Sequence, residues 1–214
     1  MILLPRLLVL TDRRRSEEQG RPLVETVAAA VEGGARAVLL REKDLPDPAR
    51  EELGRELLDL VAREGGVLIV ASDRELAARL AVAGVHLAAS EDWRPVEELE
   101  LVVGRSCHDL DELRRARQTG ADYATLSPLY PSPSKPGYGP TLGPERLAML
   151  LRQVRNAPPV FALGGMTAER VQPCLEAGAY GVAVMGAVMG AQHPAQSVAA
   201  FMDRLPEPTP FAGG

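Results

Sequence analysis

Residues 33–43, GGARAVLLREK, contain the pattern that decides the fold: two glycines, a short apolar run and a group of charged residues. Glycine at the end of a helix is typical of a left-handed cap before a turn. The apolar run is nearly continuous rather than alternating, which indicates a parallel strand buried on both faces. Arg41, Glu42 and Lys43 would then lie at the carboxyl end of this strand.

The same pattern recurs along the whole chain, with apolar runs alternating with alanine-rich helical stretches. The eight predicted strands cover residues 6–11, 36–42, 67–72, 84–88, 101–106, 123–127, 160–165 and 181–186. The predicted helices cover residues 22–34, 48–66, 74–84, 95–100, 109–121, 143–156, 167–179 and 194–204. Glycine caps are expected in GGARAVLL, VAGVHLA, TGADYATL and AGAYGVAV.

Eight strand–helix units in a chain of 214 residues predict an α/β protein, a single (β/α)8 TIM barrel over residues 1–206, followed by a flexible tail at 207–214. The competing architecture is a doubly wound open sheet. No GxGxxG follows the first predicted strand, which disfavours a dinucleotide-binding sheet.

The composition narrows the classes of partner. A net charge of −5 and a pI near 5.4 argue against binding to nucleic acid or to an anionic membrane. The apolar opening MILLPRLLVL is interrupted by Pro5 and Arg6 and is expected to be a strand, and no run has the length of a membrane-spanning helix. Cys107 and Cys174 have no metal-binding spacing, so free thiols and a cytoplasmic location are expected.

Polar residues are expected to gather where the strands end, because barrel proteins place their chemistry at the carboxyl ends of the strands. Arg41, Lys43 and Lys135 can converge there on one anion. Of the 24 basic residues of the chain, only Lys43 and Lys135 are lysine. This bias indicates that these two positions need a compact ammonium rather than a planar guanidinium. The alternative for residues 41–43 is a solvated charge cluster.

Other strand ends carry glycines, whose backbone N–H groups can bind an anion, and carboxylates, which can bind a cation that accompanies it. The turns at Gly164–Gly165 and Gly186 can offer backbone N–H groups to a phosphate. Asp73, with Glu91 or Asp92, can hold one hard cation whose shell a substrate phosphate completes, although Asp73 also fits a helix N-cap. His108 likewise fits a helix start. The strand ends offer no Ser–His–Asp, Cys–His or multi-His arrangement, so the residues indicate a barrel for a small phosphorylated or diphosphorylated ligand.

The loop TLSPLYPSPSKPGYGP at residues 125–140 has five prolines, which fix φ and reduce the entropy lost on ordering. It suits either a preformed substrate-binding loop or an inert surface turn. The chain resembles the thiamine-phosphate synthase and TenI superfamily in the stretch GADYATLSPLYPSPSKPG (120–137), which includes most of this loop, and in LLREKD (39–44), SDRELA (72–77), GVHL (84–87), GRSCH (104–108), ALGGMT (162–167) and GVAVMG (181–186).

The resemblance implies an enzyme of thiamine biosynthesis, a transferase that uses Mg²⁺. The family's synthase joins hydroxymethylpyrimidine diphosphate to hydroxyethylthiazole phosphate and releases diphosphate. The reaction is regarded as dissociative: diphosphate leaves first, and the thiazole nitrogen captures a pyrimidine-methyl cation. Its members are often homodimers, although the sequence itself indicates no interface.

Roles for individual residues follow from the resemblance. The residues expected at the diphosphate-bearing substrate and its metal are Arg41, Lys43, Ser72, Ser106, Lys135, Asp73 and Glu91. The residues expected at the thiazole phosphate are Ser132, Ser134, Gly165 and Gly186. In this interpretation the proline-rich loop lies between the two substrates.

The chain also departs from the family pattern. Leu39 replaces a glutamine, Ser72 replaces the asparagine before the metal-binding aspartate, and the second metal aspartate is replaced by Glu91, or by Asp92 after a one-residue shift. In these positions the chain resembles the TenI branch, whose enzyme tautomerises a thiazole carboxylate phosphate. The histidine of that tautomerase, however, aligns with Pro128 here. A thiazole tautomerase and a non-catalytic regulatory barrel that binds a thiazole phosphate therefore remain as alternatives to the synthase.

Overall fold

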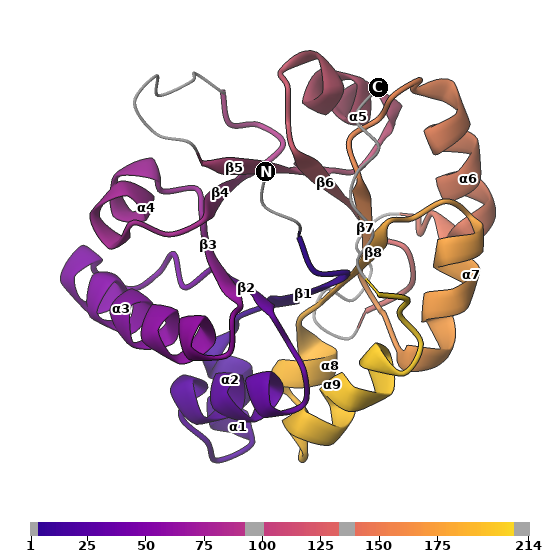
Figure 1. Ribbon diagram of the computed structural model, residues 1–214. Helices are drawn as coiled ribbons and strands as arrows, with labels where there is room; N and C mark the ends of the chain where they lie inside the picture. Colours follow the sequence, from indigo (N-terminus) through magenta and orange to yellow (C-terminus); the bar gives the residue numbers. More distant parts are fainter. Residues whose placement is uncertain (1–3, 93–100, 133–139, 208–214) are drawn as a thin grey trace.

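Eight parallel strands close into a barrel in the computed structural model, which describes residues 4–92, 101–132 and 140–207. Each strand pairs with the next along the chain, and β8 pairs with β1 (Figure 1). The strands are β1 (Leu7–Leu10), β2 (Ala37–Leu40), β3 (Val67–Ala71), β4 (Gly84–Leu87), β5 (Val102–Cys107), β6 (Tyr123–Leu126), β7 (Val160–Leu163) and β8 (Gly181–Val184). The predicted barrel is confirmed, and every strand lies where a predicted apolar run is found.

The helices form a ring around the strands (Figure 1). They are α1 (Arg13–Glu18), α2 (Leu23–Glu32), α3 (Asp47–Arg63), α4 (Arg74–Leu80), α5 (Leu110–Gln118), α6 (Gly143–Gln153), α7 (Val171–Glu176), α8 (Gly186–Met189) and α9 (Pro194–Met202), with a 3-10 turn at Ala168–Arg170. The predicted helix at 95–100 lies outside the described residues. Within the described ranges, no helix has both the length and the apolar character needed to cross a membrane.

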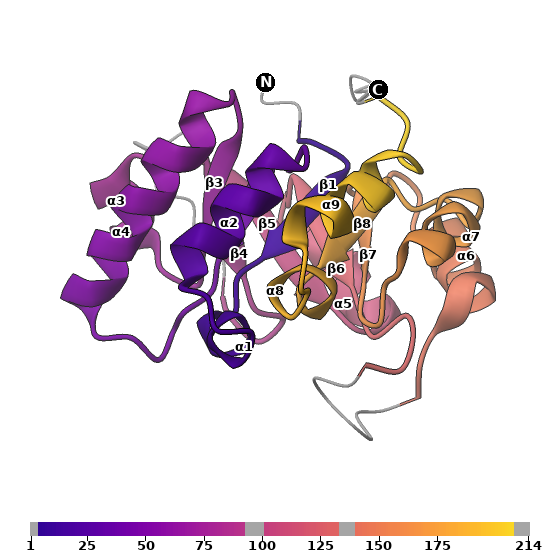
Figure 2. The same cartoon turned by 90° about the horizontal axis from the view of Figure 1, so that it is seen from below.

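Two short helices, α1 and α8, have no counterpart among the predicted elements. Both lie at the end of the barrel where the strands terminate (Figure 2), and Ser16 of α1 contacts the sulfur of Met189 of α8. Helix α1 has the sequence RRRSEE and is started by the Asp12 side chain, which accepts a hydrogen bond from Arg15 N. Neither segment is long enough to show an apolar period, so the pattern gave no signal.

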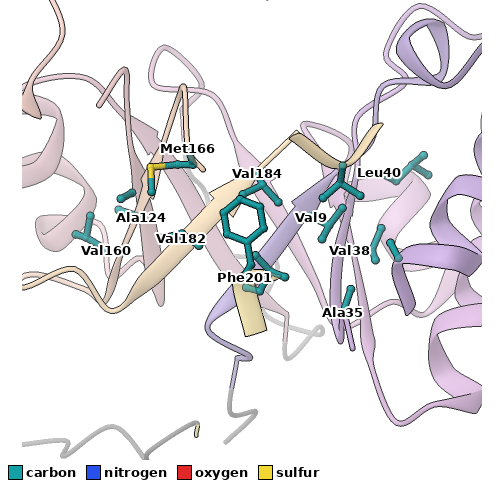
Figure 3. Close-up of a cluster of buried hydrophobic side chains, with 14 of the residues drawn as sticks. Val9, Ala35, Val38, Leu40, Ala124, Val160, Met166, Val182, Val184 and Phe201 are labelled. Carbon is teal, nitrogen blue, oxygen red and sulfur yellow. The ribbon is translucent and has the colours of Figure 1, made fainter. Parts of the chain in front are cut away.

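Alternate residues of each strand face the barrel interior and the helices. The interior holds one cluster that includes Leu8, Leu39, Ile69, Tyr123 and Phe161. The residues between them along the strands, such as Val9, Val38 and Val184, form a second cluster that includes helix residues such as Phe201 of α9 (Figure 3). Because both faces are buried, most strand residues are apolar, which is why the apolar runs are nearly continuous in the sequence.

One predicted glycine cap is wrong. Three of the four expected caps have positive φ, at Gly34, Gly120 and Gly178. In VAGVHLA, however, the left-handed residue that ends α4 is Ala81, and Gly84 is instead the first residue of β4. A Cβ at Gly84 would lie 2.3 Å from the Val102 carbonyl oxygen, so close strand contact explains this glycine.

Candidate active site

Arg41 follows β2 and continues the inward-facing series of Ala37 and Leu39. Its backbone N–H donates to Thr11 Oγ1 at 2.9 Å, and its guanidinium Nη1 lies 3.0 Å from Met185 Sδ. Arg41 therefore connects the carboxyl ends of β1, β2 and β8. The preceding inward residue, Leu39, is 1% exposed and packs in the barrel interior, so this position offers no hydrogen bond to a ligand.

Lys43 extends from the end of β2 toward the ends of β3 and β4. Its ammonium donates a hydrogen bond to Ser72 Oγ and lies 4.0 Å from Glu91 Oε1. Partial burial lowers the pKa of Lys43 below its usual 10.5, the charges of Arg41 and Arg50 lower it further, and Glu91 opposes this. The structure thus brings Arg41 and Lys43 to the same end of the barrel.

Ser72 has φ +58°, in the left-handed region that few non-glycine residues adopt. Asparagine is enriched in this conformation, and it is the residue that the family resemblance has at this position. The Ser72 backbone N–H donates to the His86 carbonyl at 2.9 Å, which fixes the chain between β3 and α4. Its hydroxyl oxygen accepts the hydrogen bond from Lys43.

Asp73 is the N-cap of α4, which is one of the two roles that the sequence left open, and it also forms an ion pair with Arg50. Its Oδ1 accepts a hydrogen bond from Leu76 N at 2.8 Å and caps α4, while its Oδ2 lies 3.0 Å from Arg50 Nη1. Arg50 is 6% exposed and also donates to the Ala71 carbonyl at 2.6 Å. Arg50 could not be recognised from the sequence, because a charged residue in a helical pattern normally faces solvent.

Glu91, rather than Asp92, has its carboxylate held toward the site. Glu91 Oε2 accepts from Ala88 N at 2.7 Å, and its other oxygen faces Lys43. The backbone oxygen of Asp92 accepts a hydrogen bond from Arg74 at 2.7 Å. The Glu91 backbone oxygen is fixed in turn by Arg105 Nη2 at 2.6 Å.

Asp73 and Glu91 could coordinate a hard cation only if substrate phosphate oxygens supplied further ligands. No group of three or more His, Cys, Asp or Glu residues that could hold a metal exists within the described ranges. Asp73 and Glu91 are partly exposed and supply oxygen donors, the type that Mg²⁺ prefers. Mg²⁺ commonly binds through one or two carboxylates plus substrate phosphates and water, and this donor set agrees with that arrangement.

Ser106 lies at the end of β5, in contact with a buried histidine. Its Oγ is 3.0 Å from His86 Nε2, and His86 Nδ1 is 3.0 Å from the hydroxyl of Tyr123. Burial lowers the pKa of His86 to about 3, and the nearby charges of Lys43, Arg41 and Arg105 act in the same direction. His86 is therefore neutral at physiological pH. Tyr123 gave no functional signal in the sequence, because a tyrosine in a strand is usually a packing residue.

The first part of the proline-rich loop is fixed against the turn after β7. Leu129 N donates to Leu163 O at 2.9 Å, and Tyr130 N donates to Gly164 O at 3.1 Å. Arg170 lies over the Tyr130 ring at 4.4 Å from its centroid and donates to the Gly165 carbonyl. The base of the loop and the glycine turn are thus one connected unit.

The two glycines expected at the thiazole phosphate have different surroundings. A Cβ at Gly165 would lie 2.4 Å from the Pro131 carbonyl oxygen, and its φ is +61°, so only glycine fits there. A Cβ at Gly186 would meet no atom within 4 Å. Ser132 is the last residue before the gap, whereas Ser134 and Lys135 lie outside the described residues.

His108 has the helix-start geometry that the sequence allowed. Its Nδ1 lies 2.9 Å from Glu112 Oε2, which also accepts from the His108 backbone N–H at 2.7 Å. Asp109 caps α5 by accepting from Glu112 N. These contacts account for His108 without a ligand.

The comparisons with known proteins identify a family for this chain. The family model for thiamine monophosphate synthase matches residues 7–188. A thiamine-phosphate synthase of Roseiflexus sp. (strain RS-1) is 38% identical over 193 residues, which cover 87% of this chain and 79% of that relative. That of Roseiflexus castenholzii is 37% identical over 202 residues, covering 91% of this chain and 86% of the relative.

A solved structure gives the same result. The thiamine phosphate pyrophosphorylase of Pyrococcus furiosus is 31% identical and superposes with a TM-score of 0.79, covering 92% of this chain and 94% of that one. Since the family model spans most of the barrel and the curated relatives align over nearly all of it, the chain belongs to the thiamine monophosphate synthase family.

Proposed function

We propose that the protein is a thiamine-phosphate synthase, a transferase that couples hydroxymethylpyrimidine diphosphate with hydroxyethylthiazole phosphate to give thiamine phosphate and diphosphate. Family membership and the names of the relatives support this activity. The observation that most favours it is the meeting of Arg41 and Lys43 at the barrel end that also holds Asp73 and Glu91. This end combines the cations and the carboxylates that a diphosphate with its metal requires.

In this proposal the protein needs no nucleophile. The chemical demand is to stabilise the departing diphosphate and to hold the two rings in contact. Arg41 supplies a delocalised guanidinium and Lys43 a compact ammonium. Lys43 is held by Ser72 and faces Glu91, so its charge is oriented before the substrate binds.

Asp73 and Glu91 would hold Mg²⁺ through one carboxylate each, with diphosphate oxygens and water as the other ligands. When bound, the ion neutralises charge on the leaving diphosphate. The Arg50 ion pair and the α4 cap keep the Asp73 carboxylate in one orientation. The Ala88 N–H does the same for Glu91.

The thiazole phosphate would bind at the turns after β7 and β8, next to Met185, which Arg41 contacts. Backbone of Gly165 and Gly186 and the hydroxyls of Ser132 and Ser134 are the proposed contacts. The glycine turn is already fixed by Arg170 and by the base of the proline-rich loop, which supports a preformed cradle. Lys135, further along that loop, would reach the diphosphate-bearing substrate.

The thiazole tautomerase is less well supported, because its reaction needs a positioned acid or base. The residue at the relevant position is Pro128, which has no titratable group. The family resemblance also leads us to propose a cytoplasmic homodimer, and light scattering after gel filtration measures the oligomeric state.

Purified protein incubated with both precursors and Mg²⁺ tests the activity, with thiamine phosphate and diphosphate measured together. Equal formation of both products is the expected result. Binding of the thiazole phosphate without product would overturn the synthase proposal and favour the tautomerase or a non-catalytic barrel. Replacing one precursor at a time by buffer is the control, because the synthase releases diphosphate only when both are present.

A further inference from the structure

Tyr123, His86 and Ser106 form a line of hydrogen bonds that leads from the barrel interior to its mouth. Tyr123 is fully buried and His86 is 6% exposed. The Tyr123 hydroxyl lies 3.0 Å from His86 Nδ1, and His86 Nε2 lies 3.0 Å from Ser106 Oγ. The three residues come from neighbouring strands β4, β5 and β6, so the barrel register fixes their spacing.

The burial of Tyr123 determines the direction of these bonds. A buried phenol that does not donate its hydrogen loses the free energy of a hydrogen bond. Within the described residues, His86 Nδ1 is the hydrogen-bond partner of this hydroxyl, and the buried hydroxyl of Thr125 makes no bond to it. Tyr123 must therefore donate to His86 Nδ1, which must be unprotonated.

The histidine then has only one arrangement that satisfies both neighbours. With Nδ1 as acceptor, the single proton of the neutral ring lies on Nε2 and is donated to Ser106 Oγ. Because the Ser106 oxygen accepts the hydrogen bond from His86 Nε2, the hydroxyl hydrogen of Ser106 points away from His86. In the other tautomer the Tyr123 hydrogen would have no acceptor, and Ser106 would donate to the ring.

We propose that Tyr123 and His86 are positioning residues that fix Ser106 as a hydrogen-bond donor toward the anionic ligand at the barrel mouth. The ligand class is a diphosphate, and this part of the inference rests on the proposed function. A serine turned the other way would present lone pairs to the anion and repel it. The relay thus sets whether the Ser106 hydroxyl attracts or repels a diphosphate.

The tautomer can be measured without any ligand. Long-range ¹H–¹⁵N NMR of histidine-labelled protein distinguishes the two ring nitrogens of each histidine. The chain has three histidines, and the variants His108→Gln and His193→Gln assign the remaining signal to His86. A neutral ring protonated on Nε2 is expected. A proton on Nδ1 would overturn the relay, whether or not the protein is a synthase.

The effect on the ligand is measured by calorimetric titration with inorganic diphosphate in the presence of Mg²⁺. Tyr123→Phe keeps the ring and its edge contact with Phe161 but removes the hydroxyl. We expect its affinity for diphosphate to fall about tenfold, the size of one hydrogen bond to a charged group. Tyr180→Phe is the matched control, because its hydroxyl donates to the Leu4 carbonyl, away from His86, and it should leave the affinity unchanged.

A double-mutant cycle separates positioning from general structural damage. Ser106→Ala should lose about the same factor of ten, and Tyr123→Phe should add nothing in that background. Additive losses would overturn the positioning role, and an unchanged affinity in Ser106→Ala would overturn the ligand contact. If the expected tautomer is found but no thiamine phosphate is formed in the synthase assay, the synthase proposal fails and the orientation of Ser106 stands.

Discussion

Arg50 Nη1 lies 3.0 Å from Asp73 Oδ2, and this ion pair joins α3 to the carboxyl end of β3. The Asp73 carboxylate is thereby held from two sides before any ligand arrives, by Arg50 and by the N–H of Leu76. Arg50 is itself nearly buried, so each charge depends on the other. Asp73 therefore contributes to stability, and it is also the carboxylate that we propose as a ligand of Mg²⁺.

Substitution of Asp73 should separate these two roles. Asp73→Asn keeps an oxygen that can cap α4 but removes the charge opposite Arg50, so we expect a loss of about 2 kcal/mol in the free energy of unfolding. Asp73→Ala should lose about 1 kcal/mol more, because the cap is also removed. Urea denaturation measures both. In the synthase assay Asp73→Asn should need a much higher Mg²⁺ concentration, and an unchanged requirement would contradict its role as a ligand.

The lowered pKa of Lys43 predicts an early alkaline limit for activity. As pH rises, Lys43 loses its charge below the ordinary lysine value of 10.5, and binding of the diphosphate substrate should weaken with it. The pH profile of kcat/KM reports this group in the free enzyme. Lys43→Arg keeps a positive charge at all these pH values. It should therefore abolish the alkaline limb of the profile, in which kcat/KM falls as pH rises, at some cost in rate. A limb unchanged in Lys43→Arg would assign it to another group.

Buried His86 should make the protein less stable in acid. Its pKa is about 3 in the folded protein and near 6.5 when unfolded, so the unfolded state binds the proton first. The stability is fully present above pH 6.5 and decreases as pH falls toward 3. At pH 4.5 the loss from this group is about 3 kcal/mol, from 1.36 kcal/mol per pH unit.

Denaturation at pH 7.5 and pH 4.5 checks this prediction. The difference between the two pH values should shrink in His86→Gln and remain in His193→Gln, because His193 is exposed. The carboxylates of the chain contribute equally to the pH dependence of both variants, so their effect cancels when the two variants are compared. An NMR titration in which His86 becomes protonated near pH 6 would contradict the depressed pKa.

The two glycine turns should respond differently to the same change. Gly165→Ala places a Cβ against the Pro131 carbonyl at positive φ, so we expect it to destabilise the fold by about 1–3 kcal/mol. Gly186→Ala meets open space and should leave the free energy of unfolding within about 0.5 kcal/mol of the parent. If backbone at Gly186 approaches the thiazole phosphate, the same variant should raise the KM for that substrate. An unchanged KM would remove Gly186 from the site.

Lys135 lies outside the described residues, so its expected role comes from the family resemblance. Lys135→Ala should reduce turnover sharply while leaving the unfolding midpoint nearly unchanged. Arg114→Ala is the matched control, because Arg114 is half-exposed on α5 and forms an ion pair with exposed Asp111 at 3.2 Å, a contact worth at most about 1 kcal/mol. Full activity of Lys135→Ala would exclude the loop lysine from the diphosphate site.

The barrel could be predicted from the sequence because burial on both faces leaves a strong local signal. Each strand is a run of four to six residues such as AVLL or VLIVA, with no polar residue on a solvated face. The end of α4 was not predicted correctly from the segment VAGVHLA. The left-handed cap is Ala81, and Gly84 is explained by its close contact with Val102. That contact joins neighbouring strands and has no local signature.

Much of the candidate site could also be expected, since Arg41, Lys43 and Asp73 directly follow strands and carry charge. Which of the carboxylates of Glu91 and Asp92 faces Lys43 could not be predicted, because the Ala88 N–H holds the Glu91 side chain in that direction. Arg50 had no signal at all, since its partner Asp73 comes from a different strand–helix unit.

The sequence by itself determined the number and order of the strands, the end of the barrel at which chemistry gathers, and the residue types available there. These follow from periodicity and from the rule that parallel strands share one carboxyl edge. Only the tertiary structure decided which side chains meet: Arg50 with Asp73, Lys43 with Ser72, and Tyr123 with His86 and Ser106. The physical reason is that hydrogen bonds and ion pairs between strands depend on barrel closure and register, which bring together residues far apart in the chain.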